Sequence, residues 1–229
     1  KDPAYARYDC DLEKTVDNLV DGSFFNSGQS CCGIERIYVD EKIFNSFLEL
    51  FISKTYNYKL GNPLEQENNL GPVVKLSAAE FIINQMNKAL DKGAKKMIDE
   101  NKFHFPKEHK NYLVPQILTN VTHEMDFMTE ETFGPCVGIM KVSDENEAVK
   151  LMNDSPYGLT ASIWTNDIGV AEKIGNQVQT GTFFMNRCDY LDPALSWTGV
   201  KETGKGCSLS EIAYEKLTAP KSFHLRKGQ

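Results

Sequence analysis

The alternation of short apolar runs with longer segments of helical spacing is the feature that most constrains the fold. Runs rich in β-branched and aromatic residues predict strands at 37–39, 112–118, 138–142, 160–164 and 182–185. Apolar residues three and four positions apart predict helices at 11–25, 40–52, 77–92, 144–153 and 167–177. Strands that alternate with helices form parallel βαβ units. We therefore predict an α/β fold with an open, mostly parallel sheet flanked by helices.

Local signals suggest where several of these helices begin and end. Asp40 can cap the second helix, and Ser77–Glu80 has the composition of a capping box at the start of the third. Gly28 can end the first helix because glycine tolerates left-handed backbone angles. The polar and aromatic residues 101–111 predict a surface hairpin or loop.

The last residues of the chain alternate between apolar and polar side chains. Phe223 and Leu225 would fall on one side of a strand, with polar residues on the other. A strand of this kind can pair with another sheet or with another subunit. We therefore divide the chain into a body at 1–214 and a terminal oligomerisation strand at 215–229.

Composition restricts the classes of function. The chain has 229 residues and a formal net charge of −7, and it has no apolar run of the roughly 18–20 residues that a membrane span needs. The acidic balance argues against a nucleic-acid partner. The four histidines show no metal-ligand spacing, so we expect no metal. The six cysteines, which are widely spread apart from one adjacent pair, fit reduced thiols in the cytoplasm, with the mitochondrion as the alternative.

Two adjacent cysteines, Cys31 and Cys32, form the first candidate site. A cysteine is often no more than a small buried apolar residue. Here the Gly28–Ser30 turn places the pair just after a helix end, where backbone N–H groups can point at a ligand. A thiol attacks as the thiolate, and the N–H at the nucleophile can stabilise an oxyanion. At most one of the two thiols is expected to be the nucleophile.

A second candidate site is the loop that contains Glu130, Glu131 and Phe133. The two glutamates fit an ordinary solvated pair. Alternatively, one carboxylate accepts both hydroxyls of a ribose, and Phe133 supplies an apolar face for a flat ring. The glycine-rich stretch 194–206, with Trp197 inside it, is by itself more typical of a loop with an anchoring aromatic residue than of a site.

Taken together, these stretches resemble the aldehyde dehydrogenase superfamily. The segment 25–31 with Arg36 is similar to the active-cysteine signature of the family, and 131–135 is similar to its cofactor-clamping motif. Further similar stretches lie at 60–74, 112–135, 155–167, 181–186 and 197–206. The resemblance is specific because the stretches follow the family's order over nearly the whole chain.

The resemblance implies the catalytic domain of an NAD(P)-dependent enzyme that oxidises an aldehyde to a carboxylic acid through a cysteine thiohemiacetal and a thioester. By resemblance, Cys31 is the nucleophile and the next cysteine is a neighbour. Glu131 would hold the nicotinamide ribose, and Phe133 would lie beside the nicotinamide. Phe25 and Trp197 would line the substrate funnel. The identity of the aldehyde and the choice between NAD and NADP stay open.

The chain departs from the family pattern at two places. Lys1 falls where the lysine of the Glu-Leu-Gly-Gly-Lys stretch would stand, so we expect the general base and the Rossmann cofactor domain to belong to polypeptide before it. That missing domain would be a partner of this chain, and the chain alone would be inactive. Ser208 stands where many relatives carry a glutamate. Asn186 resembles a positioning residue, and the tail resembles a strand that joins subunits into a homodimer or homotetramer.

Two other interpretations remain. A thiol hydrolase or acyltransferase would need a histidine within reach of Cys31, and no histidine lies in a motif that suggests one. A non-catalytic relative, kept for structure or assembly, is favoured by Ser208 but opposed by the intact Cys31 and Glu131.

Overall fold

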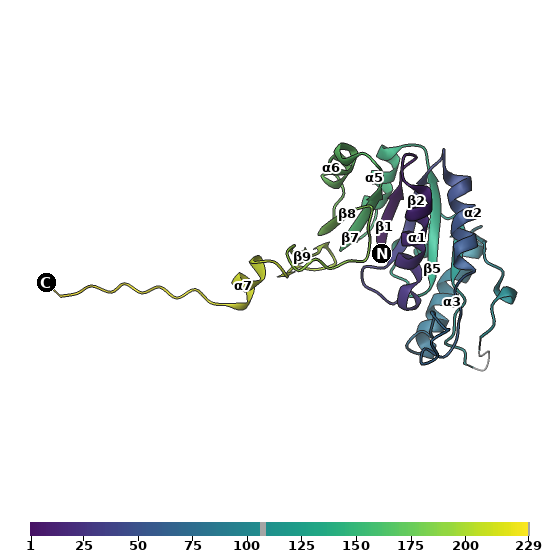
Figure 1. Cartoon of the computed structure of the whole chain (residues 1–229), viewed down its shortest axis with the longest axis horizontal. Coiled ribbons are helices and arrows are strands. Elements are labelled where there is room, and N and C mark those ends of the chain that lie inside the picture. The colour runs from purple at the N-terminus through teal and green to yellow at the C-terminus, as the bar shows by residue number, and fades with distance from the viewer. Residues whose placement is uncertain (106–108, 229) are drawn as a thin grey trace.

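A seven-stranded sheet forms the centre of the molecule in the computed structural model, which describes residues 1–105 and 109–228 (Figure 1). Its strands are β1 (Asp2–Ala6), β2 (Ile34–Asp40), β3 (Lys95–Lys96), β4 (Gln116–Thr119), β5 (Cys136–Val142), β7 (Thr160–Trp164) and β8 (Thr182–Met185). They lie in the order β3-β4-β5-β2-β1-β7-β8. Neighbouring strands are parallel except for the antiparallel pair β3 and β4. The predicted open, mostly parallel α/β sheet is confirmed.

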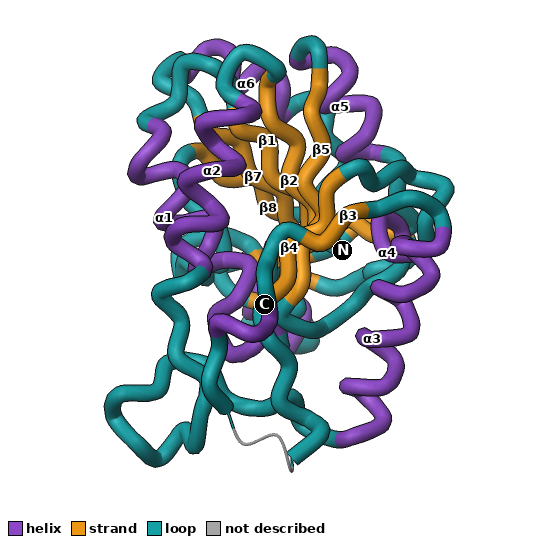
Figure 2. Tube along the Cα trace, turned by 90° about the vertical axis from the view of Figure 1, so that its right-hand side faces the viewer, coloured by secondary structure: helices purple, strands orange, loops and turns teal. Residues whose placement is uncertain are grey.

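Helices cover both faces of this sheet. They are α1 (Leu12–Phe24), α2 (Phe44–Thr55), α3 (Leu76–Asp91), α4 (Asp126–Thr129), α5 (Glu145–Asn153) and α6 (Ile168–Gly175). Figure 2 shows α1 and α2 on one face and α3, α4 and α5 on the other. The strands supply a core to each face by alternation: Ala4 and Ala6 pack with α1 and α2, whereas Tyr5 packs on the opposite side.

The strand β1, which lies next to the middle strand β2, was not predicted from the sequence. Its residues, Asp-Pro-Ala-Tyr-Ala, are few, include no β-branched side chain, and contain a proline, which usually marks an edge strand. The structure accommodates Pro3 because the register of β1 against β2 shifts between Asp2 and Pro3. Ala4 and Ala6 are fully buried, so the small side chains lie where a helix covers the sheet.

Most expected elements are present, with shifted ends. The strands expected at 37–39, 138–142, 160–164 and 182–185 are confirmed, and the one expected at 112–118 begins at residue 116. The capping box at Ser77–Glu80 is wrong, because α3 begins at Leu76 without a side-chain cap. Asp40 ends β2 and accepts the Lys42 N–H at 3.0 Å, so it does not cap α2. Within the loop expected at 101–111, residues 106–108 lie outside the described residues.

The end of the chain departs from the body (Figure 1). A short helix, α7 (Ile212–Leu217), is followed by residues 218–228, which form no strand with the rest of the described chain. Phe223 and Leu225 are 71% and 86% exposed. The expected division between 214 and 215 therefore falls inside α7, and pairing of the tail with another subunit stays a prediction. Residue 229 lies outside the described residues.

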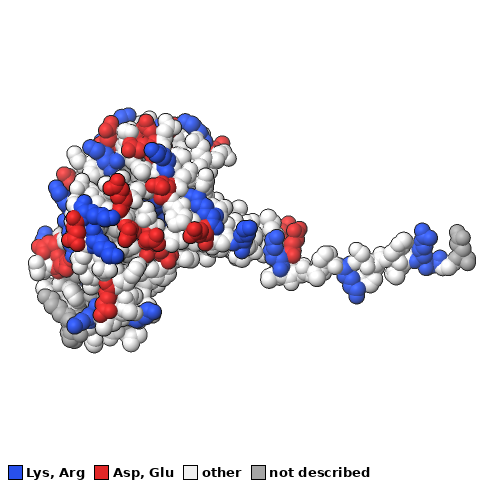
Figure 3. Space-filling view, turned by 180° about the vertical axis from the view of Figure 1, so that it is seen from behind, with Lys and Arg blue, Asp and Glu red and all other residues white. Residues whose placement is uncertain are grey.

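The surface carries both signs of charge. Figure 3 shows Lys and Arg side chains interspersed with Asp and Glu over the drawn face of the body. Within residues 1–105 and 109–228, none of the helices has the length and apolar character needed to cross a bilayer. The same residues contain no group of three or more His, Cys, Asp or Glu side chains arranged to hold a metal ion.

A buried arginine ties the sheet to the end of α5. Arg36 on β2 is 0% exposed. Its guanidinium donates to the carbonyl oxygens of Leu151 and Met152 at 3.3 Å and of Asp154 at 3.4 Å, and its Nε donates to Lys1 O at 3.0 Å. The last carbonyls of a helix have no partner within the helix, and a cation satisfies both their hydrogen bonds and the helix dipole.

Replacing this arginine should destabilise the fold. Arg36→Met keeps an apolar stem but removes the guanidinium donors from the carbonyls of the buried residues Lys1 and Met152, so we expect the free energy of unfolding to fall by about 3 kcal/mol. Arg226→Met, at an exposed tail position, should change it by less than about 0.5 kcal/mol. Urea unfolding measures both values, and equal effects of the two variants would contradict the role of Arg36.

Candidate active site

The turn that carries the cysteines connects α1 to β2. Asn26, Ser27 and Gly28 follow the helix with φ values of +51°, +58° and +68°, all in the left-handed region. For residues other than glycine this conformation is disfavoured, and it persists where neighbours hold it. Ser27 Oγ donates to the carbonyl of Gly71 at 2.7 Å, which fixes one end of the turn.

The side chain of Gln29 holds the other end of the turn. Its Nε2 donates to Asn26 O at 3.0 Å, and its Oε1 accepts the Val74 N–H at 2.8 Å. Residues 71–74 therefore pack along the turn. Gln29 thus has a structural role at this position, because its side-chain amide joins the turn to the backbone of Val74.

The two adjacent thiols lie in different environments. Cys31 is exposed, and in the described part of the chain no backbone carbonyl accepts its N–H. Cys32 is 6% exposed, and its Sγ donates to Asp189 Oδ1 at 2.7 Å. Burial raises the pKa of the Cys32 thiol well above its ordinary value, and the Asp189 carboxylate raises it further. Cys32 is thus held as a thiol, while Cys31 is open to a reaction partner.

Sequence analysis missed Asp189. This residue lies in a loop after β8, far from the cysteines in sequence, and its φ of +50° places it in the left-handed region. Besides Cys32, it accepts a hydrogen bond from Ser30 Oγ at 3.2 Å. An aspartate in a loop carries no motif that would have pointed to this contact, so the fold alone brings it to the site.

The loop with Glu131 and Phe133 packs directly on the cysteine turn. The backbone of Gly28 meets the carbonyl of Gly134 so closely that a Cβ at Gly28 would overlap its oxygen. Glu131 is exposed, and Phe133 is 39% exposed with a φ of +54°. The structure therefore brings together the two stretches that the sequence singled out.

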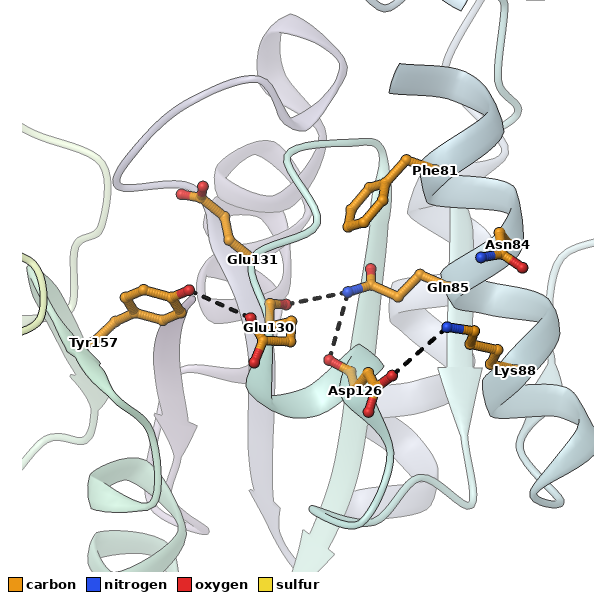
Figure 4. Close-up of a pocket in the computed structure, with 8 residues that line it drawn as sticks. All are labelled: Phe81, Asn84, Gln85, Lys88, Asp126, Glu130, Glu131 and Tyr157. Atoms are coloured by element: carbon orange, nitrogen blue, oxygen red, sulfur yellow. Dashed lines mark hydrogen bonds and ion pairs between the residues drawn. The ribbon is translucent and has the colours of Figure 1, made fainter. Parts of the chain in front are cut away.

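A cleft of about 320 Å³ lies between this loop and α3 (Figure 4). It is lined by Phe81, Asn84, Gln85, Lys88, Asp126, Glu130, Glu131 and Tyr157. Glu130 Oε2 accepts from the Tyr157 hydroxyl at 3.5 Å. In Figure 4 the Glu131 carboxylate extends away from the hydrogen bonds that join Glu130 to its neighbours. It is therefore free to accept hydroxyl groups from a molecule in or above the cleft.

The two residues expected along a substrate path lie on different elements, and their role in lining such a path stays a prediction. Phe25 directly follows α1 and is 59% exposed beside the cysteine turn. Trp197 lies on a small antiparallel ladder between β9 (Trp197–Thr198) and β11 (Cys207–Ser208), where it is the partner of Ser208. A second ladder joins β6 (Tyr157–Gly158) to β10 (Val200–Lys201). No hydrogen bond among the described residues links the Trp197 ladder to the cysteine turn.

The side chain of Asn186 holds the backbone of a neighbouring strand. Its Oδ1 accepts the Thr165 N–H at 3.0 Å, and its Nδ2 donates to Thr165 O at 2.8 Å. Both amide atoms are used at the C-terminal ends of β7 and β8, whereas the cysteine turn precedes β2. Asn186 thus supports the sheet at the end opposite the cysteines.

The histidines do not supply a base for the thiols in the described structure. His123 has both ring nitrogens engaged: Nε2 with the Tyr38 hydroxyl at 2.8 Å and Nδ1 with Asp154 Oδ2 at 2.7 Å. Burial and the Arg36 charge lower the pKa of His123, against the opposing effect of Asp154. Hydrogen bonds to Cys31 or Cys32 come from no histidine among the described residues. This arrangement gives no support to the thiol-hydrolase interpretation.

Comparison with known proteins was made on sequence and on structure. The family model described as "Aldehyde dehydrogenase family" matches residues 1–223. The chain is 33% identical over 211 residues to 3-sulfolactaldehyde dehydrogenase of Priestia aryabhattai, covering 92% of this chain and 43% of that protein. It is 34% identical over 216 residues to a succinate semialdehyde dehydrogenase [NAD(P)+] of Escherichia coli, covering 94% and 46%.

The solved structures agree with the sequence relatives. Betaine aldehyde dehydrogenase of Staphylococcus aureus in complex with NAD+ aligns with a TM-score of 0.87 and 30% identity, over 94% of this chain and 43% of that one. Glyceraldehyde-3-phosphate dehydrogenase of Methanocaldococcus jannaschii complexed with NADP aligns with a TM-score of 0.83 and 31% identity, over 90% and 44%. The chain spans less than half the length of these relatives.

The unequal environments of the two thiols predict unequal reactivity. At pH 8, iodoacetamide should label Cys31 at least about tenfold faster than Cys32, because the thiolate is the reacting form. Asp189→Asn removes the charge beside Cys32 and should speed labelling of Cys32 without changing that of Cys31. Peptide mass spectrometry over time measures both rates, and faster labelling of Cys32 in the unsubstituted protein would contradict this assignment.

Proposed function

The chain belongs to the aldehyde dehydrogenase family, and we propose that it is the catalytic domain of an NAD(P)-dependent enzyme that oxidises an aldehyde to a carboxylic acid. One observation carries the proposal. The exposed thiol of Cys31 lies on a strained turn that packs against the loop presenting Glu131 and Phe133. A nucleophile and a candidate cofactor clamp therefore share one surface.

In the proposed reaction, the Cys31 thiolate attacks the carbonyl carbon of the aldehyde. A carbon–sulfur bond forms, and the carbonyl oxygen becomes an oxyanion. The Cys31 N–H, which no backbone carbonyl in the described chain accepts, is suited to donate to that oxygen. Loss of hydride from the same carbon leaves a thioester on Cys31. Attack by water then breaks the carbon–sulfur bond, releases the carboxylic acid and restores the thiol.

The residues present fit a nicotinamide dinucleotide at one end. Glu131 offers an exposed carboxylate that suits the paired hydroxyls of a ribose, and Phe133 offers an exposed apolar ring. Their cleft of about 320 Å³ accommodates part of such a molecule. When bound, the nicotinamide supplies the hydride acceptor. Solved relatives with NAD+ and with NADP leave both cofactors in the proposal.

The chain does not hold all the parts that this reaction needs. Its 229 residues contain no complete glycine-rich phosphate-binding loop. We therefore propose that the chain alone does not turn over aldehyde and acts together with further polypeptide, as the greater length of its relatives suggests. The six cysteines are free thiols, which favours a reducing compartment such as the cytoplasm. The exposed tail is the proposed contact for a homodimer or homotetramer.

The choice of nucleophile can be tested in the full-length protein. Cys31→Ala removes the attacking atom and should lower the rate of NAD(P)-dependent aldehyde oxidation by roughly 10³-fold or more. Cys32→Ala, a matched change at the adjacent residue, should leave activity within about fivefold of the parent. Steady-state formation of NAD(P)H measures both, and similar losses in the two variants would refute the assignment of Cys31.

The ribose role of Glu131 predicts a separate effect. Glu131→Gln keeps the size of the side chain but removes the charge, so cofactor affinity and hydride transfer should fall by roughly tenfold. Alkylation of Cys31 by iodoacetamide should be unchanged. Glu49→Gln, the same change at an exposed position of α2 on the other face of the sheet, is the control and should leave both cofactor affinity and hydride transfer unchanged. Unchanged kinetics in Glu131→Gln would remove the ribose role.

A further inference from the structure

A buried carboxylate lies between the two parts of the candidate site. Glu35 stands on β2, four residues after Cys31, and is 4% exposed. Its oxygens accept the N–H of Thr132 at 2.9 Å and the N–H of Phe133 at 2.9 Å. The strand that begins at the cysteines thus bonds directly to the backbone of the loop that carries Glu131.

A buried lysine completes the contact of Glu35. The Lys1 ammonium lies 2.6 Å from Glu35 Oε2, and its side chain is 0% exposed. The same ammonium donates to Thr132 Oγ1 at 2.7 Å and lies 4.9 Å from the centre of the Phe127 ring. Both charged side chains therefore bond to Thr132 of the loop as well as to each other.

The loop is held from its other side by α3. Thr132 Oγ1 donates to Gln85 Oε1 at 2.6 Å. Gln85 Nε2 in turn lies 3.5 Å from Asp126 O and 3.4 Å from Glu130 O. The backbone from Asp126 to Phe133 is thus bonded to both the sheet and a helix, while no hydrogen bond from residues 1–105 or 109–228 engages the Glu131 side chain between these anchors.

The conformation of Phe133 requires such support. Its φ of +54° is a left-handed value, which a bulky side chain adopts at a cost in energy. The Glu35 carboxylate accepts the N–H of this same residue, so the bond acts where the backbone is least favourable. Loss of the bond would let Phe133 relax and would move Glu131, two residues earlier.

Stability alone is a weak reason for this ion pair. Desolvation of two buried charges commonly offsets their attraction, and an apolar pair of similar size is often as stable. Burial raises the pKa of the Glu35 carboxyl, but the Lys1 charge and the hydrogen bonds lower it more, to a net value below the ordinary one. The carboxylate is therefore ionised at neutral pH and able to accept from both backbone amides.

We propose that Glu35, paired with Lys1, is a positioning residue that fixes the Glu131–Phe133 segment against the Cys31 turn and so sets where the ribose and nicotinamide ring come to lie relative to the thiol. The inference rests on the proposed roles of Cys31, Glu131 and Phe133. Glu35 itself touches neither substrate nor cofactor.

The test uses Glu35→Gln in the full-length protein. Whichever way the new amide turns, its NH₂ group faces either the two backbone N–H groups or the Lys1 ammonium, so one contact is lost. Without cofactor, the amides of Thr132 and Phe133 should exchange with deuterium about tenfold faster. The KM for NAD(P) should rise about tenfold, and alkylation of Cys31 should stay within about twofold of the parent rate.

Asp2→Asn is the matched control. Asp2 is a buried carboxylate on the neighbouring strand β1, 2% exposed, and it bonds to the Thr160 N–H and hydroxyl, away from the loop. It should leave exchange at Thr132 and Phe133 and the KM for NAD(P) unchanged. Equal effects of Asp2→Asn and Glu35→Gln would mean general loosening and would overturn the positioning role.

The outcomes separate this inference from the proposed function. Unchanged exchange at Thr132 and Phe133 in Glu35→Gln overturns the positioning role, whatever the activity. Faster exchange in that variant, with no effect of Glu131→Gln on cofactor affinity, supports the positioning contact and refutes the ribose role. If Glu35→Gln does not fold, the paired variant Lys1→Met/Glu35→Gln removes both buried charges, and the same exchange measurement decides.

Discussion

The parallel pairing of β1 with β2 is the constraint on which the rest of the structure depends. These two strands form the middle of the sheet, with β5 beyond one and β7 beyond the other. Their first residues lie side by side, so Lys1 and Glu35 meet at the start of the pair. Arg36 binds the carbonyl of Lys1 and the end of α5 from the next position. This one pairing therefore positions three other parts of the structure. They are the cysteine turn, the loop with Glu131 and the helix α5.

Local sequence patterns predicted most strands of the sheet, including the middle strand β2, but not its neighbour β1 or the short edge strand β3. Strands β5 and β7 are rich in apolar residues and largely buried, and this burial leaves a signal in the sequence. The strand β1 is buried just as deeply, but it achieves this with alanines and a proline, because helices pack closely over it and the register shifts at Pro3. Its place is decided by neighbours far along the chain, which no local pattern records.

The candidate site divides in the same way. Cys31, Glu131 and Phe133 lie in stretches with a recognisable order, and the fold brings the two stretches into contact. Asp189 and Glu35 carry no such signal. Asp189 is an acidic residue in a loop, and Glu35 is a charged residue inside an apolar strand. The contact partner that reveals the role of each lies far away in the sequence, 157 residues for Asp189 and 98 residues for Glu35. Motifs therefore identify the reacting groups, whereas the side chains that hold them become visible in three dimensions.

The topology of the sheet has a consequence for how the chain folds during its synthesis. Asp2 on β1 bonds to Thr160, which lies 158 residues later in the sequence, and β1 pairs with β7 along this edge. Long-range contacts of this kind slow folding, because closing a large loop costs conformational entropy before the contact contributes any stability. During synthesis β1 is made long before β7, because 158 residues separate Asp2 on β1 from Thr160 on β7. The edge of β1 that pairs with β7 therefore stays unpaired until β7 has been made, and an unpaired strand edge of this kind favours aggregation.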